Sequence, residues 1–150
     1  MAHEIPLTSR SLPIALLRAR ERVMGPIRRM LVEAGVTEQQ WRVLRVLEEE
    51  GPQEPTHIAD RACLLLPSLT RILQKLEAKG LVVRKSHPVD KRRQIVEITV
   101  KGAGIIRDNI DYTLLLAEEI RNTLGPERHE ALLDLLNDLH QLKLQSDSRD

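Results

Sequence analysis

The sequence predicts a mainly helical α+β fold, organised as one domain over residues 1–150, and three observations lead to this prediction. Apolar residues recur at helical spacing through most of the 150 residues, a pattern typical of amphipathic helices. One short region between residues 81 and 98 changes to the alternation that is typical of β-strands. The aromatic content is 1%, so the core has to be aliphatic, as suits helices packed on helices.

The first helix is expected over residues 11–34. Ser11 can cap its amino terminus, Pro13 fits its first turn, and Gly35 can end it. The pair Gly25–Pro26 interrupts the apolar pattern. Because proline lacks a backbone donor and collides with the preceding turn, we expect a kink or a break at this pair.

Two shorter helices are expected next. The first begins at Thr37 and stops at Gly51–Pro52. The second has Pro55 at its first position and runs to Ala62. Its expected inner face consists of Ile58, Ala59 and Ala62.

A further helix is expected from Pro67 to about Lys79, with Gly80 as its cap. Its apolar stripe consists of Leu69, Ile72, Leu73 and Leu76. Its opposite face carries small polar and cationic side chains, namely Ser68, Thr70, Arg71, Gln74 and Lys75. A helix with these two faces can pack on a core and dock on a nucleic acid.

A hairpin follows this helix. Leu81–Lys85 and Gln94–Ile98 are the expected strands, joined by a long basic loop over residues 86–93. Two short helices, a strand, a basic loop and a strand form the order of a winged helix-turn-helix unit. We assign this unit to residues 37–99.

Long helices flank the winged unit on both sides. Thr99 can cap a helix that runs to about Thr123, and after Gly125–Pro126 a last helix runs to about Leu144. The leucine and isoleucine stripes of 11–34 and 100–145 need a surface to pack on, because exposing them is costly. They could pack on each other within one chain, but symmetric pairing with a second copy is favoured. A two-fold dimer would place two recognition helices about 34 Å apart, one turn of DNA.

The charge distribution supports a polyanionic partner. The net charge of the chain is +1, yet Arg71 to Arg93 holds eight basic and two acidic residues, a net charge of +6. Asp108 to Asp150 holds four basic and ten acidic residues, a net charge of −6. A strong local positive field is typical of a face that binds nucleic acid, although a solvated charged face has the same composition.

Other classes of function receive little support. Cys63 is the only cysteine, and the chain has no signal pattern and no apolar run of membrane-spanning length, so we expect a cytoplasmic protein that does not enter a membrane. No Gly-rich phosphate loop or nucleophile elbow is present, so we expect no enzyme, no catalytic residue and no cofactor.

Two histidines raise the question of a metal site. His57 precedes Asp60 by three residues, and His129 is followed by Glu130. A zinc site needs three or four converging ligands, and the sequence does not supply them at either place. We therefore expect ordinary surface histidines and no metal.

Three motifs identify the chain as resembling the MarR family of transcriptional regulators along nearly its whole length. The motifs are residues 37–44 (TEQQWRVL), residues 67–82 (PSLTRILQKLEAKGLV) and residues 90–99 (DKRRQIVEIT). Further stretches, LLRARE at 16–21 and RACLLLPSLT at 61–70, resemble the branch that regulates homoprotocatechuate-degradation operons.

The resemblance implies a set of DNA contacts. It places Ser68, Thr70, Arg71, Gln74 and Lys75 in the major groove, where arginine can pair with guanine and glutamine with adenine. It places Arg92 at a wing tip that enters the minor groove, whose negative potential attracts arginine. Lys85, Lys91 and Arg93 suit phosphate contacts. Asp90 is anionic, so we expect it to pair with an arginine and fix the hairpin within this DNA-binding loop.

The resemblance also implies an effector pocket between the winged unit and the dimerisation helices. Members of the family often bind small aromatic acids there, which lowers their affinity for DNA. Trp41 could line this pocket, although packing in the core is an equal alternative. Arg18, Arg22 and Arg45 are candidate partners of a carboxylate, because the guanidinium fork matches that group.

The resulting hypothesis is a dimeric repressor of an aromatic-compound catabolism operon. It would bind a pseudo-palindromic operator in double-stranded DNA and release it when a small phenolic or aromatic acid binds. The alternative is a DNA-binding regulator that is switched by oxidation of Cys63. Because Cys63 stands at an apolar-looking helix end, we expect instead a buried and inert thiol.

Overall fold

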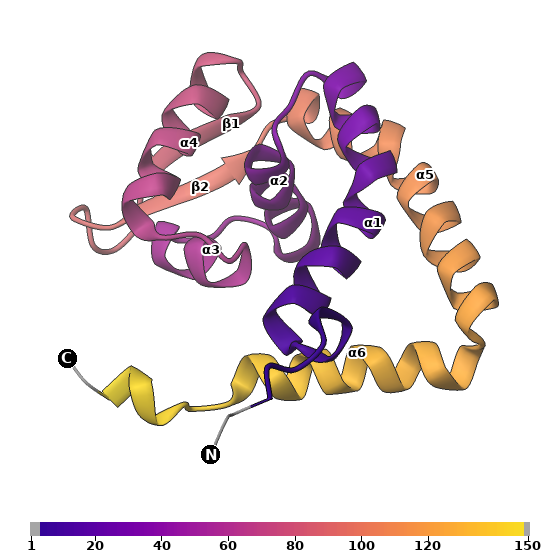
Figure 1. The fold of residues 1–150 in the computed structure, drawn as a ribbon. Coiled ribbons are helices and arrows are strands. Elements are labelled where there is room, and N and C mark those ends of the chain that lie inside the picture. Colours follow the sequence, from indigo (N-terminus) through magenta and orange to yellow (C-terminus); the bar gives the residue numbers. More distant parts are fainter. Residues whose placement is uncertain (1–3, 149–150) are drawn as a thin grey trace. The chain divides into compact units, whose positions relative to one another are not determined.

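The computed structural model describes residues 4–148, with side-chain exposure for residues 4–146, and it divides into two compact units between Asn109 and Ile110. The first unit contains the predicted order of helices and strands (Figure 1). Its elements are η1 (Thr8–Arg10), α1 (Leu12–Ala34), α2 (Glu38–Glu50), α3 (Pro55–Arg61), α4 (Leu66–Ala78), β1 (Val82–Ser86), β2 (Gln94–Ile98) and the first part of α5 (Val100–Leu124).

Helix α1 runs without interruption through Pro26, so the alternative of a break at Gly25–Pro26 is wrong. Proline removes one backbone hydrogen bond, and the residue before it has no Cβ that could clash with its ring, since that residue is Gly25. Met30 and Leu31 are buried in the core on the far side of the proline. Their packing offsets the loss of one hydrogen bond in a helix of 23 residues.

Helix α2 begins as the sequence predicts. The Thr37 hydroxyl accepts a hydrogen bond from the Gln40 amide at 3.1 Å, and the Gln40 side chain accepts one from the Thr37 amide at 3.2 Å. This capping box satisfies two donors that a helix terminus would otherwise leave free. The helix then buries Val43, Leu44 and Leu47, which are at most 1% exposed.

An ion-pair cluster joins α1 to the start of α2. Arg28 lies 2.7 Å from Glu21 and 2.6 Å from Glu38, and Arg20 lies 2.6 Å from Glu38. The hydrogen bonds that Arg28 donates hold the pKa of both carboxyl groups below their ordinary value. The cluster therefore links α1 to the first turn of α2 through mostly exposed ion pairs, which add little to stability.

Helices α3 and α4 pack through the predicted apolar faces. Ile58 and Ala59 of the first are buried, as is Ala62, which caps this helix one residue after its end at Arg61. All four predicted apolar residues of the second are also buried, namely Leu69, Ile72, Leu73 and Leu76. Gly80 follows α4 with a φ of 72°, the left-handed conformation that glycine adopts without strain. The amide of Leu81 bonds the carbonyl of Leu76 at 2.9 Å, and for this reason β1 begins one residue later than predicted.

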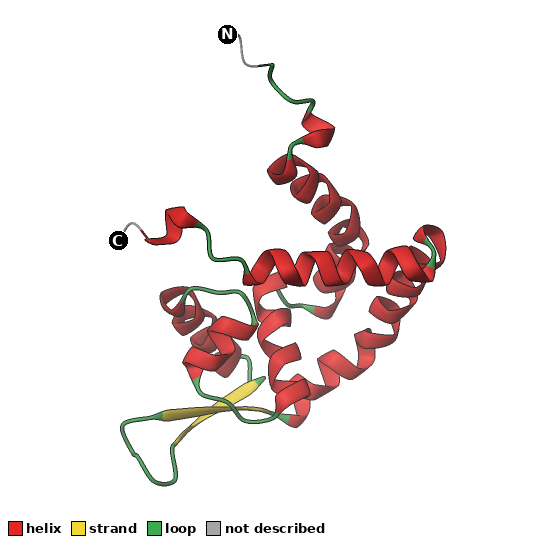
Figure 2. Cartoon of the chain, turned by 90° about the horizontal axis from the view of Figure 1, so that it is seen from below, coloured by secondary structure: helices red, strands yellow, loops and turns green. Residues whose placement is uncertain are grey.

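The two strands form an antiparallel hairpin in which Val82 faces Ile98 and Ser86 faces Gln94. Gln53, in the loop between α2 and α3, adds a third segment, because its amide and carbonyl bond those of Val96 at 3.0 and 2.8 Å. The loop between the strands extends beyond the rest of the first unit (Figure 2). The hairpin base is therefore tied to the helices, whereas its tip projects outward.

Thr99 caps α5, as predicted. Its hydroxyl accepts a hydrogen bond from the Gly102 amide at 3.1 Å and donates one to the Gly80 carbonyl at 2.7 Å. Gly102, Ala103 and Ile106 are then buried in the first unit. The first turns of α5 are thus packed against the end of α4 and the start of the hairpin.

The second unit contains the rest of α5, α6 (Pro126–Gln141) and η2 (Gln145–Ser148). Helix α6 ends three residues before the predicted end, because Leu142 has extended backbone angles. Between residues 110 and 146, where exposure is described, no side chain is buried. Large apolar side chains exposed there include Leu114, Leu115, Leu132, Leu133, Leu135 and Leu136. None of the helices within residues 4–148 combines the length and hydropathy that crossing a bilayer requires.

Candidate nucleic-acid interface and effector pocket

Helix α4 presents its polar face to solvent. All five predicted contact residues on this face are exposed, namely Ser68, Thr70, Arg71, Gln74 and Lys75. The buried leucines on the opposite side fix the rotation of the helix, so this exposure follows from the core packing. Within residues 4–148, neither Arg71 nor Lys75 forms an ion pair with a carboxylate. Both cations are available to an external anion.

The hairpin tip is held by its own hydrogen bonds. The His87 ring Nδ1 accepts from the amides of Val89 and Asp90 at 3.2 and 3.1 Å. The His87 amide also bonds the Arg93 carbonyl at 2.9 Å. No role was predicted for His87, since only the folded loop brings its ring within hydrogen-bond distance of these amides. The result is a defined turn that presents the basic residues of the tip.

Asp90 pairs with an arginine, as predicted. Its Oδ1 atom accepts from the Arg92 amide at 3.1 Å and from Arg92 Nε at 3.3 Å. The Arg92 side chain is nevertheless 92% exposed, so the pairing orients the guanidinium without covering it. Lys91 beside it is exposed and forms no ion pair within the described chain.

The remaining basic residues of the hairpin are paired with carboxylates. Lys85 lies 2.8 Å from Glu97 on the opposite strand. Arg84 reaches Glu77 at the end of α4 through two hydrogen bonds of 3.3 Å, which hold the pKa of Glu77 below its ordinary value. The positive charge seen in the sequence is therefore partly balanced at the base of the wing, and least balanced on α4 and at Lys91.

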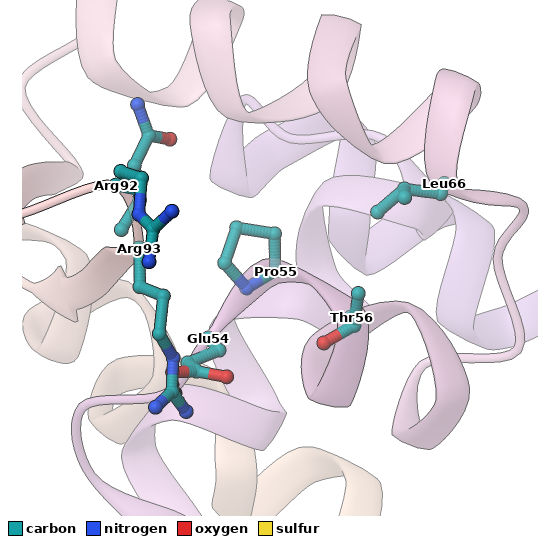
Figure 3. Close-up of a pocket in the computed structure, with 7 residues that line it drawn as sticks. Glu54, Pro55, Thr56, Leu66, Arg92 and Arg93 are labelled. Atoms are coloured by element: carbon teal, nitrogen blue, oxygen red, sulfur yellow. Dashed lines mark ion pairs between the residues drawn. The ribbon is translucent and has the colours of Figure 1, made fainter. Parts of the chain in front are cut away.

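A hollow of about 310 Å³ lies between the starts of α3 and α4 and the wing (Figure 3). Arg92 and Arg93 of the wing line it on one side. Leu66 of α4 and Glu54, the residue before α3, also line it. Arg93 forms an ion pair with Glu54. Glu54 was not predicted as a site residue, because nothing local marks a residue whose partner lies 39 positions later in the chain.

A second hollow, of about 280 Å³, includes two of the four residues predicted to bind an effector. Trp41 and Arg45 both line it. Trp41 is 8% exposed and belongs to the core cluster. Its side chain therefore packs in the core and also lines the hollow. The other residues that line this hollow are Arg42, Val46, Glu49, Arg61, Ala62 and Cys63. Arg42 and Arg61 add cationic groups that were not predicted from the sequence.

Arg18 and Arg22 do not line this hollow. Both lie on the exposed surface of α1, and Arg18 donates a hydrogen bond to the Thr8 hydroxyl at 2.9 Å. The structure thus separates the predicted effector residues into a pair in the hollow and a pair on α1.

Cys63 is exposed, so the expectation of a buried thiol is wrong. It occupies the turn after α3 with a φ of 55°, a left-handed conformation that directs the chain into α4. The apolar residues around it suggested burial, but Leu65 and Leu66, which follow it, are themselves exposed.

Neither histidine motif forms a metal site in the part of the chain that the structure describes, which holds no group of three or more histidine, cysteine or acidic ligands. His57 instead lies 2.8 Å from Glu50, which also pairs with Arg61 at 3.1 Å. His129 lies 3.7 Å from its neighbour Glu130.

Comparison with known proteins supports the resemblance seen in the motifs. A model of the MarR family matches residues 36–93. The chain is 39% identical over 136 residues to the HTH-type transcriptional regulator FarR of Neisseria gonorrhoeae, and the aligned region covers 89% of this chain and 91% of that protein. It is 42% identical over 95 residues to the homoprotocatechuate degradative operon repressor of Escherichia coli, and the aligned region covers 63% of this chain and 64% of that protein. These relatives are regulators of transcription, a class of protein that is distinct from enzymes.

Two solved structures share the fold over almost the whole chain. The crystal structure of NadR in complex with 4-hydroxyphenylacetate has a TM-score of 0.82 and 36% identity, and covers 95% of this chain and 100% of that one. The structure of the repressor CouR bound to a 23-mer DNA duplex has a TM-score of 0.76 and 27% identity, and covers 94% and 100%. The predicted winged-helix fold is confirmed, and the chain belongs to the MarR family of transcriptional regulators.

Proposed function

We propose that this protein is a dimeric, cytoplasmic repressor of an aromatic-compound catabolism operon that leaves its operator when a small phenolic or aromatic acid binds. The observation that carries the proposal is the pair of cationic surfaces in the first unit. The exposed face of α4 and the projecting wing both point into solvent and both carry basic side chains. No catalytic role is part of the proposal.

The roles of the DNA-binding residues follow from their chemistry. Arg71 and Gln74 read guanine and adenine in the major groove, and Ser68, Thr70 and Lys75 contact neighbouring base edges or phosphates. Arg92 enters the minor groove, where the negative potential is concentrated. Asp90 orients Arg92 for this entry through their hydrogen bonds. Lys85, Lys91 and Arg93 contact phosphates, which adds affinity without sequence information.

Dimer formation through the flanking helices is supported by their exposed apolar residues. In α1, Leu12, Leu16 and Leu17 are 38–59% exposed. Burying these apolar side chains against a second copy would stabilise a dimer. In the second unit, α6 has no buried residue at all among those described. A second copy would cover both surfaces and present two α4 helices to a pseudo-palindromic operator. CouR, a relative with this fold, is bound to a 23-mer duplex.

The effector proposal rests on the hollow that Trp41 and Arg45 line. An aromatic acid needs an apolar surface for its ring and a cation for its carboxylate, and these two residues supply both. NadR, which has the same fold, is bound to 4-hydroxyphenylacetate. Arg18 and Arg22 do not line the hollow within one chain, so their contact with the acid is a prediction that depends on the arrangement of the proposed dimer. The acid releases DNA only if it binds the non-binding state more tightly.

The test of this function is a gel shift on the DNA upstream of the protein's own gene. We expect the purified dimer to retard this DNA. The complex is then titrated with 4-hydroxyphenylacetate, phenylacetate and cinnamate-type acids, and we expect at least one of them to release the DNA. In the Arg45→Ala variant, release should need about tenfold or more acid, since a charge-assisted hydrogen bond is lost. Arg45→Lys is the matched variant, which keeps the charge and loses the fork. Failure of every aromatic acid to release the wild type would exclude the effector proposal.

The wing makes a separate prediction. Arg92→Ala should weaken binding to the upstream DNA and lower the slope of log K against log salt by about one for each subunit. Fluorescence anisotropy over a salt series measures both quantities. Arg128→Ala removes an exposed arginine outside the winged unit and should leave the slope unchanged. Equal slopes for the wild type and Arg92→Ala would remove the wing tip from the interface.

The thiol-gated alternative remains a second candidate, and the exposure of Cys63 favours it. Its position beside Trp41 and Arg45 means that oxidation would change the same hollow. In the gel shift, the Cys63→Ser variant distinguishes the two functions. A variant that still responds to its aromatic acid excludes the thiol as the switch.

A further inference from the structure

The wing and α4 differ in how their cations are balanced. In the wing, Arg93 is paired with Glu54 and Arg92 with Asp90. On α4, Arg71 and Lys75 form no ion pair within residues 4–148. The α4 cations that would read bases are therefore free, whereas Lys85 and Arg93, two of the three wing cations suited to phosphate, already hold a carboxylate. Of these carboxylates, Glu54 comes from a different part of the chain.

The position of Glu54 is fixed by the fold. The residue before it, Gln53, is bonded to Val96 through both backbone groups, and the Gln53 side chain donates to the Glu50 carbonyl at 3.2 Å. The residue after it, Pro55, begins α3. Val96 is fully buried. With both neighbours anchored, the Glu54 carboxylate stays at the base of the wing, where only side-chain rotation can remove it from Arg93.

The Glu54 carboxylate lies at the hollow between α3, α4 and the wing, which Figure 3 shows with Arg92 and Arg93 on one side. The Glu54 side chain is 31% exposed and that of Arg93 is 52% exposed, so a solvent-borne anion can reach the guanidinium. Carboxylates and phosphates are both anionic partners of arginine, and Arg93 Nη2 here approaches a single oxygen of Glu54, which makes no hydrogen bond among the described residues. The two anions therefore compete for one partner.

We propose that Glu54 is an internal competitor of DNA phosphate, which withholds Arg93 from binding that does not depend on sequence. This inference rests on the proposed DNA-binding function and adds to it a residue that sets the strength of non-specific binding. A phosphate has to displace the carboxylate before Arg93 can neutralise it. A regulator faces a large excess of unrelated DNA sites. When phosphate contacts, which every sequence offers, contribute less to the affinity, the base contacts of α4 determine a larger share of it.

The experiment uses the full chain and an unrelated duplex of arbitrary sequence. In Glu54→Gln, Arg93 is released, so non-specific binding at low salt should tighten severalfold and the slope of log K against log salt should steepen by about 0.9 for each subunit. Glu33→Gln is the matched control, because Glu33 is an exposed α1 carboxylate without an ion pair within the described residues. It changes the net charge equally, and we expect a much smaller effect from it.

Two further variants make the test decisive. The Glu54 side chain makes no capping hydrogen bond to α3, so Glu54→Gln should fold, and Glu54→Ala should give the same result without supplying an amide. In an Arg93→Gln background, Glu54→Gln should have only the small effect of Glu33→Gln. Equal effects of Glu54→Gln and Glu33→Gln, or a full effect without Arg93, would overturn the inference. If the wild type ignores duplex DNA at low salt, the proposed function itself fails.

Discussion

Replacing Gly102 with alanine is expected to lower the free energy of unfolding by about 1–3 kcal/mol, the usual range for overpacking a core. A methyl group on Gly102 would overlap the backbone carbonyl oxygen of Leu81 and lie 2.8 Å from Ile98 Cγ1. Backbone cannot rotate away as a flexible side chain can. Urea denaturation followed by circular dichroism measures the change, with an unaltered slope showing that the unfolding reaction is the same.

Gly104→Ala provides the control for this prediction. It lies in the same helix, and no described heavy atom outside its own helix neighbourhood comes within 4 Å of a methyl group placed there. Alanine forms helix better than glycine by up to about 1 kcal/mol, so this variant should be stabilised. If both variants are destabilised equally, the close approach of α5 to Leu81 does not determine the stability.

The contact at Gly102 has a consequence for function. It holds the first turn of α5 against the end of α4 and the start of the hairpin, where Thr99 also bonds the Gly80 carbonyl. An alanine that shifts this turn would therefore displace the start of the hairpin as well as lower the stability of the protein.

Arg71→Ala is expected to weaken operator binding by about 1–3 kcal/mol, or about five- to 150-fold, the range for losing a bidentate contact to a base. Arg71 is exposed on the polar face of α4 and forms no ion pair within the described chain. Its removal leaves no buried partner unsatisfied, so the loss reports the contact with DNA. Fluorescence anisotropy on the operator and on single-base variants of it measures the effect.

The matched variant is Lys91→Ala, which removes a wing cation expected to contact phosphate. It should weaken binding to all sequences alike and leave the preference among single-base variants unchanged. Arg71→Ala should instead flatten that preference at one position of each half-site. If both variants behave alike, α4 does not read bases through Arg71.

The features that were predicted correctly from the sequence are local ones. The apolar stripe of Leu69, Ile72, Leu73 and Leu76 specifies which face of α4 is buried, and the opposite face is exposed as a consequence. Capping at Thr37 depends on residues within one helical turn. The alternation of Gln94–Ile98 predicts its strand with the bounds that the structure has. Spacing along the chain determines each of these patterns.

Most of the features that were missed depend on contacts between distant residues. The path of α1 through Pro26 is decided by the packing of Met30 and Leu31 against the core, and a proline pattern does not contain that information. The exposure of Cys63 depends on a left-handed turn whose apolar neighbours remain in solvent. The pairing of Arg93 with Glu54 needs the bridge between Gln53 and Val96, which brings a loop to a strand.

By itself, the sequence determined the order of helices and strands, the buried faces and the family, because helical and strand periods are written in neighbouring residues. Only the tertiary structure decided which of the basic residues are free and which are already paired. Charge can be counted along a chain, but its availability to DNA depends on the carboxylates that folding places within reach of each cation.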